Sequence, residues 1–187
     1  MVQLIYGANM SLDGYIEDEQ GRFDWSVVDN ETHGFWNEFQ RSIGTYLYGR
    51  RIYETMVYWE TSGASDNDSL LSKEFAKLWR AANKIVYSRT LQVPSSQSTI
   101  IKHDFDIEEV RRLKQSTNKN LSISGAELAG MAMKHGLVDE CILLVNPIVL
   151  GAGKKAFYDG VHTQLTLLAS YPLTNGVVVL HYQVENT

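Results

Sequence analysis

The chain has only one cysteine among its 187 residues, and this scarcity limits what the protein can be. A single thiol cannot close an internal disulfide, and it excludes a cysteine-rich zinc site. Cys141 stands in the apolar run of residues 141–145, so we expect a buried core thiol rather than a nucleophile. The five histidines are scattered without ligand spacing, so no metal site is predicted.

The chain also has fewer basic than acidic residues, and it has no long apolar run. The chain carries 17 Lys and Arg residues against 22 Asp and Glu residues, a formal net charge of −5. This balance disfavours non-specific nucleic-acid binding, so an anionic ligand would need a local basic patch. No run reaches transmembrane length, and residues 1–6 lack the basic leader and apolar core of a signal peptide. We therefore expect a cytoplasmic protein without membrane or nucleic-acid partners.

Several catalytic signatures are absent. The sequence has no G-x-G-x-x-G after its first apolar run, no P-loop, no H-E-x-x-H and no G-x-S-x-G elbow. A standard dinucleotide-binding fold, a P-loop NTPase, a zinc peptidase and a serine hydrolase are thus not indicated. The composition, 44% hydrophobic and 21% charged, is that of an ordinary globular domain, and no linker is visible, so residues 1–187 are expected to form one domain.

Runs that predict strands alternate with stretches of helical periodicity. A helix is expected from Asp29 or Asn30 to about Ser42, with Gly44 as its stop, and another opens at Asp106. Residues 61–69 form a polar loop. Strands are expected at residues 2–10, 46–48, 84–88, 99–103, 121–124, 140–145, 165–169 and 177–184. This order predicts an α/β fold, a mostly parallel mixed sheet between two helical layers with an antiparallel C-terminal hairpin.

Two strand-to-helix junctions are the most informative feature present. Residues 45–49 and 121–125 are each a β-type run that ends in a glycine, and a plausible helix follows. Glycine permits a sharp turn and lets a ligand approach the backbone, and a helix N-terminus suits a phosphate. Arg50 and Arg51 add positive charge at the first junction. Together the two junctions predict a nucleotide cofactor at the ends of a sheet.

Six motifs, in order, resemble the dihydrofolate-reductase-like superfamily. They are Ala-Asn-Met-Ser-Leu-Asp-Gly at 8–14, Tyr-Gly-Arg-Arg-Ile-Tyr-Glu at 48–54, Val-Tyr-Ser-Arg at 86–89, Ile-Ser-Gly-Ala-Glu-Leu at 123–128, Gly-Leu-Val-Asp-Glu at 136–140 and Pro-Ile-Val-Leu-Gly-Ala-Gly at 147–153. Within it, the chain is most similar to the reductase domain of riboflavin biosynthesis (RibD C-terminal domain-like) and its stand-alone bacterial relatives. The resemblance implies a three-layer α/β/α dihydrofolate reductase-like fold, NADPH as the cofactor and a homodimer.

The resemblance also implies cofactor-binding residues. Gly49, Arg50 and Arg51 would meet the phosphates, with an arginine favouring the 2′-phosphate. The remaining residues carried over are Ala8 beside the nicotinamide, Ser88 and Arg89 on the adenosine side, and Ser124, Gly125, Ala126 and Glu127 around the pyrophosphate. The arginines would supply the local positive charge that a net-acidic protein needs.

The substrate side is less defined. Hydride transfer to a C=N or C=O bond needs a nearby proton source, and Asp13, just after the first strand, is the candidate catalytic and substrate-binding group. Its alternative is an ordinary Asp-Gly turn. Trp25 could stack on a flat heterocycle, or it could be a core residue. A pyrimidine- or pteridine-like ring is the expected small-molecule substrate.

Two departures from the family pattern narrow this expectation. Residues 31–36 lack the helical carboxylate pattern of folate reductases, and residues 15–19 are acidic where basic phosphoribosyl contacts are expected. A phosphorylated substrate is thus disfavoured, and a smaller uncharged heterocycle stays open. The alternatives are a dihydrofolate reductase-type enzyme, a non-catalytic module that binds NADPH or a small ligand, and a purely structural oligomer.

Overall fold

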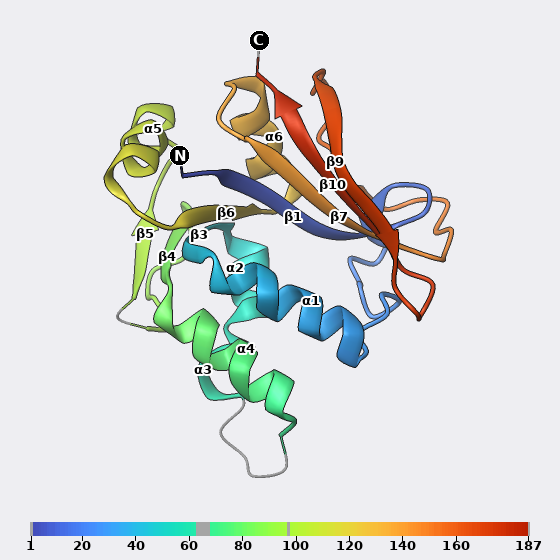
Figure 1. The fold of residues 1–187 in the computed structure, drawn as a ribbon. Coiled ribbons are helices and arrows are strands. Elements are labelled where there is room, and N and C mark those ends of the chain that lie inside the picture. The colour runs from blue at the N-terminus through green and yellow to red at the C-terminus, as the bar shows by residue number, and fades with distance from the viewer. Residues whose placement is uncertain (1, 63–67, 97, 187) are drawn as a thin grey trace.

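An eight-stranded sheet runs through the middle of the computed structural model, which describes residues 2–62, 68–96 and 98–186 (Figure 1). Within these residues, the strands from β5 to β7 are parallel, and β10 and β9 form an antiparallel hairpin at one edge. In spatial order they are β5 (Thr99–Lys102), β4 (Asn83–Tyr87), β3 (Ile43–Gly49), β6 (Asn120–Ser124), β1 (Leu4–Ser11), β7 (Glu140–Asn146), β10 (Val178–Glu185) and β9 (Gln164–Pro172). The predicted mixed sheet with a C-terminal hairpin is confirmed.

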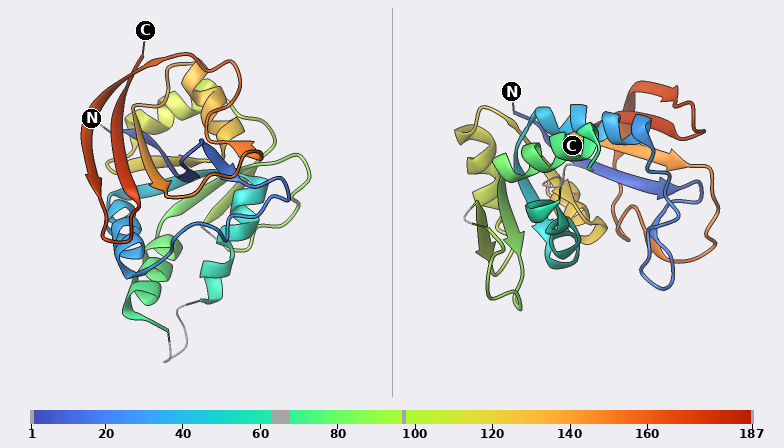
Figure 2. Two further views of the ribbon diagram at one scale, coloured as in Figure 1. Left: turned by 90° about the vertical axis from the view of Figure 1, so that its right-hand side faces the viewer. Right: turned by 90° about the horizontal axis from the view of Figure 1, so that it is seen from below.

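Helices cover both faces of this sheet (Figure 2). They are α1 (Asn30–Arg41), α2 (Arg50–Met56), α3 (Tyr58–Thr61), α4 (Leu70–Ala81), α5 (Ile107–Ser116) and α6 (Ala126–Lys134). Ile5 of β1 packs in the core shared with α1 and α4, whereas Leu4 and Tyr6 pack in the core shared with α5 and α6. This alternation is the period of two expected of a strand buried on both sides. It confirms the three-layer α/β/α architecture.

Two helices begin where the sequence places them. The side chain of Asp29 accepts a hydrogen bond from the backbone N–H of Thr32 at 2.9 Å, and α1 follows. The side chain of Asp106 accepts from the N–H of Glu108 at 2.9 Å at the start of α5. In each case a short acidic side chain satisfies a first-turn donor that the helix leaves without a partner.

The predicted stop of α1 at Gly44 is wrong. The helix ends at Arg41 with Ser42 as its cap, and Gly44 lies within β3. A Cβ atom at Gly44 would lie 2.8 Å from the Cβ of Lys119, closer than real contacts allow. The glycine is therefore explained by close approach of a neighbouring segment rather than by helix termination.

A two-stranded ribbon that the sequence did not predict lies outside the main sheet. β2 (Tyr15–Glu17) pairs antiparallel with β8 (Lys154–Lys155), which places Glu17 opposite Lys154. At Gly153 φ is +139°, and a Cβ there would lie 2.0 Å from the carbonyl oxygen of Glu17. Only glycine fits this position, so Gly153 allows the two segments to meet.

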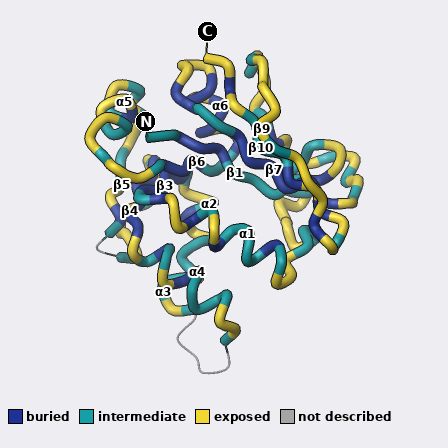
Figure 3. Tube along the Cα trace, in the orientation of Figure 1, coloured by how far each residue is buried: buried dark blue, intermediate teal, exposed yellow. Residues whose placement is uncertain are grey.

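The central strands are the most buried part of the chain (Figure 3). Cys141 on β7 is fully buried, and burial raises the pKa of its thiol to about 12, so the predicted core thiol is confirmed. No helix in the described ranges is long and apolar enough to cross a membrane. Of the predicted polar loop at 61–69, residues 63–67 lie outside the described residues.

Candidate active-site cleft

A cleft of about 2030 Å³ opens at the carboxyl ends of the parallel strands. Gly49 ends β3, Ser88 follows β4 and Gly125 follows β6, and all three line the cleft. In open sheets of parallel strands, ligands bind in the crevice at this end of the strands. The sheet therefore brings segments separated by up to 76 residues to one candidate site.

Both predicted strand-to-helix junctions are present in the cleft. α2 begins after Gly49 and α6 begins after Gly125, and neither glycine position has a side-chain cap. At Gly125 φ is +96°, a left-handed conformation that other residues rarely adopt. The first N–H groups of α6 thus lack a side-chain cap from the preceding residue, as an anion site requires.

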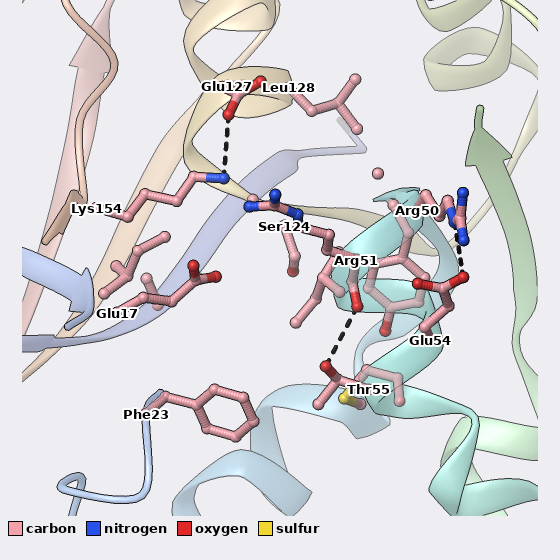
Figure 4. Close-up of a pocket in the computed structure, with 18 of the residues that line it drawn as sticks. Glu17, Phe23, Arg50, Arg51, Glu54, Thr55, Ser124, Glu127, Leu128 and Lys154 are labelled. Atoms are coloured by element: carbon pink, nitrogen blue, oxygen red, sulfur yellow. Dashed lines mark hydrogen bonds and ion pairs between the residues drawn. The ribbon is translucent and has the colours of Figure 1, made fainter. Parts of the chain in front are cut away.

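The two consecutive arginines point to different parts of the cleft. Arg50 donates to Glu54 Oε1 and to Thr90 Oγ1, each at 2.7 Å, so it lies on the β4 side. Arg51 extends the opposite way, toward Ser124 and Lys154 (Figure 4). Its guanidinium has no hydrogen-bond or ion-pair partner among the residues that the structure describes.

The residues after β4 form one end of the cleft. Ser88 Oγ accepts from the N–H groups of Thr90 and Leu91, so this serine shapes the turn rather than presenting a free hydroxyl. Arg89 donates to Asp104 Oδ1 at 2.6 Å, and His103 lies 2.9 Å from the other carboxylate oxygen. The hydrogen bonds from His103 and Arg89 lower the pKa of Asp104.

A pair of aromatic rings lies at this end, with Tyr87 buried and Phe105 half-buried. Tyr87 and Phe105 both line the cleft, and their ring centroids are 5.1 Å apart in an edge-to-face arrangement. The Tyr87 hydroxyl is buried and has no hydrogen-bond partner within the described ranges. Aromatic surface next to Arg50 and Arg89 suits a flat base that carries phosphate.

The start of α6 carries an ion pair that sequence reasoning missed. Lys154 Nζ lies 3.1 Å from Glu127 Oε1, and both residues line the cleft with Ser124 and Gly125 (Figure 4). Ala126 is buried and is not among the lining residues. Lys154 directly follows the 147–153 motif, so its position in the sequence was the one available signal.

The other end of the cleft is aromatic. Ala8 and Asn9 of β1 line it, and Trp36 Nε1 donates to Asn9 Oδ1 at 3.2 Å. Trp25 is half-buried, lines the cleft, and donates its indole N–H to the Arg22 carbonyl at 3.0 Å. Further aromatic residues that line the cleft include Phe23, Phe39 and Phe75.

Asp13 lies apart from this group. It is not among the lining residues, and its oxygens accept from Ser11 Oγ at 2.7 Å, from Leu150 N at 3.1 Å and from Gly151 N at 2.7 Å. These bonds, the one from Ser11 foremost, lower the pKa of Asp13 to about 2. The contacts are those of a carboxylate that fastens the 148–151 segment to the turn after β1.

In the described portion of the chain, no three His, Cys, Asp or Glu side chains lie together as a metal site requires. Carboxylates and basic groups of the cleft lining are instead paired, Glu54 with Arg50, Asp104 with Arg89 and Glu127 with Lys154.

Comparison with known proteins shows which protein family the chain resembles. Residues 2–179 match the model of the RibD C-terminal domain family. The uncharacterized protein YyaP of Bacillus subtilis (strain 168) is 34% identical over 182 residues, which is 96% of this chain and 94% of that protein.

Solved structures share the architecture at low identity. A Shewanella sp. PV-4 protein named for riboflavin biosynthesis aligns with a TM-score of 0.75 at 20% identity, over 99% of both chains. Dihydrofolate reductase from Enterococcus faecalis, solved with NADP(H), aligns with a TM-score of 0.65 at 12% identity, over 98% of this chain and 96% of that chain. The fold is dihydrofolate reductase-like, as the sequence motifs imply.

Proposed function

This chain belongs to the RibD C-terminal domain family, whose fold is that of reductases, and from that premise we propose that it is an NADPH-dependent reductase. The substrate would be a pyrimidine- or pteridine-like heterocycle that accepts a hydride. The observation that carries the proposal is one continuous cleft. One part holds the start of α6, which has no side-chain cap, and Arg51, whose guanidinium has no partner among the described residues; the other part holds aromatic residues and Ala8.

The residues present fit NADPH. Arg50, Arg89 and the Tyr87–Phe105 pair would receive the adenosine half, with the 2′-phosphate on the arginine side. Arg51 and the backbone of Gly125 would hold the pyrophosphate, and the bound cofactor would supply the hydride. Glu54 holds Arg50 in place through their 2.7 Å bond. The protein's part is to bind, orient and shield these groups.

We further propose a substrate without a phosphate group. The wall beside the aromatic residues carries Glu17, Asp18 and Glu19, and of these Asp18 is paired with Arg22 at 2.9 Å. Excess negative charge there would repel a phosphoryl group. A folate-type reaction is the second candidate within the same chemistry, but Glu31 on the first turn of α1 bonds Thr174 N at 2.8 Å rather than facing the cleft.

The expected homodimer and cytoplasmic location are part of the proposal. Light scattering on the purified protein tests the first, and fractionation of the source cells tests the second. Neither affects the assignment of the cleft residues.

Calorimetric titration with NADPH, and with NADH in parallel, is the first experiment. We expect Kd for NADPH at micromolar or below and weaker NADH binding, followed by loss of nicotinamide absorbance when the correct heterocycle is added. Binding without turnover of any heterocycle would favour a non-catalytic module, and no binding of either nucleotide would refute the reductase assignment.

A further inference from the structure

One buried amide group at the wall of the cleft lacks a hydrogen-bond partner. Gln40, on the last turn of α1, is only 5% exposed, and its Nε2 atom is buried without an acceptor among the described residues. Gln40 lines the cleft, so this donor lies at a binding surface rather than within a closed core. A buried N–H group without an acceptor is costly, which indicates that a ligand or an ordered water satisfies it.

Tyr46 fixes the orientation of this amide. The Tyr46 hydroxyl donates to Gln40 Oε1 at 2.6 Å and has no other acceptor in the described ranges. Burial raises the pKa of Tyr46, so the phenol stays protonated and remains a donor. The amide oxygen is therefore held toward Tyr46, and the two N–H groups of Gln40 point away from that hydroxyl.

The other buried polar atoms that lack partners lie elsewhere. Three of them, on His33, Asn37 and Glu60, belong to residues that do not line the cleft. The fourth, the Tyr87 hydroxyl, lies at the end of the cleft proposed for the adenosine half. Within the part of the chain that the structure describes, Gln40 is thus the one buried open donor beside the α1 aromatic residues.

The cleft extends below the carboxyl ends of the strands near Gln40. Tyr46 on β3 and Ser122 on β6 are register partners, and both line the cleft. Ser122 lies two residues before the end of β6, which corresponds to a depth of about 7 Å. Register partners project to the same face of a sheet, so Ser122 lies beside Tyr46 on the α1 side.

Ser122 adds a second buried polar group to this deep part of the cleft. It is only 2% exposed, and its hydroxyl has no hydrogen-bond partner among the residues described. Gln40, Tyr46 and Ser122 together offer N–H and O–H groups and carry no charge. A charged ligand group would lose its water here without a counter-charge, whereas a neutral acceptor would satisfy the open N–H of Gln40.

We propose that Gln40, Tyr46 and Ser122 form an inner subsite that binds a neutral hydrogen-bond acceptor of the substrate, such as a carbonyl oxygen, with Gln40 Nε2 as the donor. This inference rests on the proposed function and defines the chemical class of its substrate. The substrate is a ring that carries an uncharged acceptor on the side that faces α1.

Benzamide, benzoate and benzamidine are three flat probes of nearly the same shape that differ in this group. Benzamide has a neutral carbonyl, benzoate is an anion, and benzamidine is a cation without an acceptor at neutral pH. They are titrated into protein saturated with NADP⁺, which fills the proposed nicotinamide position, and the side-chain N–H signals of Gln40 are followed by NMR. We expect only benzamide to shift these signals, and to bind about 10-fold more tightly than either ion.

Three variants test the same subsite. Gln40→Met removes the donor at a similar side-chain length and should weaken benzamide binding about 10-fold. Gln40→Glu places a carboxylate there and should reverse the preference toward benzamidine, which a loss of packing alone would not do. Ser122→Val fills the subsite while the amide stays in place, and it should also weaken benzamide binding.

Gln115→Met is the matched control, because Gln115 is exposed on α5 and does not line the cleft. It should leave the affinities for all three probes unchanged. The NADP⁺ affinity of Gln40→Met should equal that of the wild type, which separates loss of the subsite from a folding defect.

Equal binding of the three probes, unshifted Gln40 signals with benzamide, or an unchanged benzamide affinity in Gln40→Met would overturn the subsite. Gln40 would then be satisfied by an ordered water alone. The wild-type signals decide this point even where a variant fails to fold. If NADP⁺ does not bind, the proposed function fails, and titration of the free protein still decides the role of Gln40.

Discussion

Arg50 and Arg51 are adjacent in sequence, but their guanidinium groups serve different parts of the cleft. Arg50 bonds Thr90 on the β4 side, and Arg51 extends toward Ser124. The 2′-phosphate is the sole difference between NADPH and NADH, whereas the pyrophosphate is common to both. We therefore expect Arg50→Ala to weaken NADPH about 10-fold more than NADH, and Arg51→Ala to weaken both alike.

Calorimetric Kd values of the wild type and the two single variants, each for NADPH and for NADH, check this division. The double variant should combine both effects. Equal losses of NADPH and NADH in Arg50→Ala would remove the 2′-phosphate contact from that arginine.

Asp13 should act on stability rather than on chemistry. Hydrogen bonds to its ionised form lower the pKa from 3.8 to about 2, so the folded state gains stability from Asp13 above its unfolded pKa. This gain is lost as the pH falls through about 4 toward 2. We expect Asp13→Asn to lower Tm by about 3 °C at pH 7, with the difference from wild type shrinking toward pH 2.

Thermal unfolding followed by circular dichroism from pH 7 to pH 2 measures this difference. If Asp13→Asn abolishes turnover while Tm stays constant, Asp13 is catalytic as the sequence suggested. The sequence could place Asp13 after the first strand. It could not show that the backbone N–H groups of Leu150 and Gly151, 137 and 138 residues further on, donate hydrogen bonds to its carboxylate.

The two strand-to-helix junctions share one sequence pattern, a strand followed by a glycine and a helix, but their glycines have different backbone conformations. Gly125 has φ of +96°, whereas Gly49 has φ of −77° and open space where a Cβ would stand. Gly125→Ala should cost about 1 kcal/mol in the free energy of unfolding, and Gly49→Ala should change it by less than about 0.5 kcal/mol.

Urea unfolding of both variants checks the comparison. Gly49→Ala is then a stable protein in which a methyl group stands in the cleft, so a fall in its NADPH affinity reports backbone approach by the cofactor. An equal loss of stability in both variants would contradict the role assigned to the left-handed turn.

Elements formed by local patterns could be predicted, and those formed by distant pairing could not. The caps at Asp29 and Asp106 and the apolar run of β7 are local, and each is found in the structure. β2 and β8 are three and two residues long and contain no apolar periodicity, so their pairing follows from tertiary geometry. Glu17 and Lys154 were missed for this reason.

At the scale of the whole molecule, the hairpin of β9 and β10 leaves apolar side chains exposed. Leu167 is 52% exposed, Leu168 is 47% exposed and Tyr171 is 44% exposed, all on the edge strand β9. Apolar groups on an open edge are commonly covered by a partner. We expect a homodimer of twice 21.2 kDa through this hairpin.

Light scattering should give the dimer mass for the wild type and 21.2 kDa for the variant Leu167→Lys with Leu168→Lys. A monomeric wild type would refute the dimer. A dimeric variant would place the interface elsewhere. The family motifs suggested a dimer, but no local pattern in the sequence showed which surface forms it.

The reactivity of the Cys141 thiol can be used to measure global opening of the protein. The thiol lies on β7, between β1 and β10, and in the folded protein it is both inaccessible and protonated. A thiol reagent should therefore modify the protein only when the central sheet separates, so the labelling rate under native conditions measures the population of the open form. Because Cys141 is the only cysteine, a single mass shift counts each opening event, and saturating NADPH should slow that labelling by the factor its binding free energy sets.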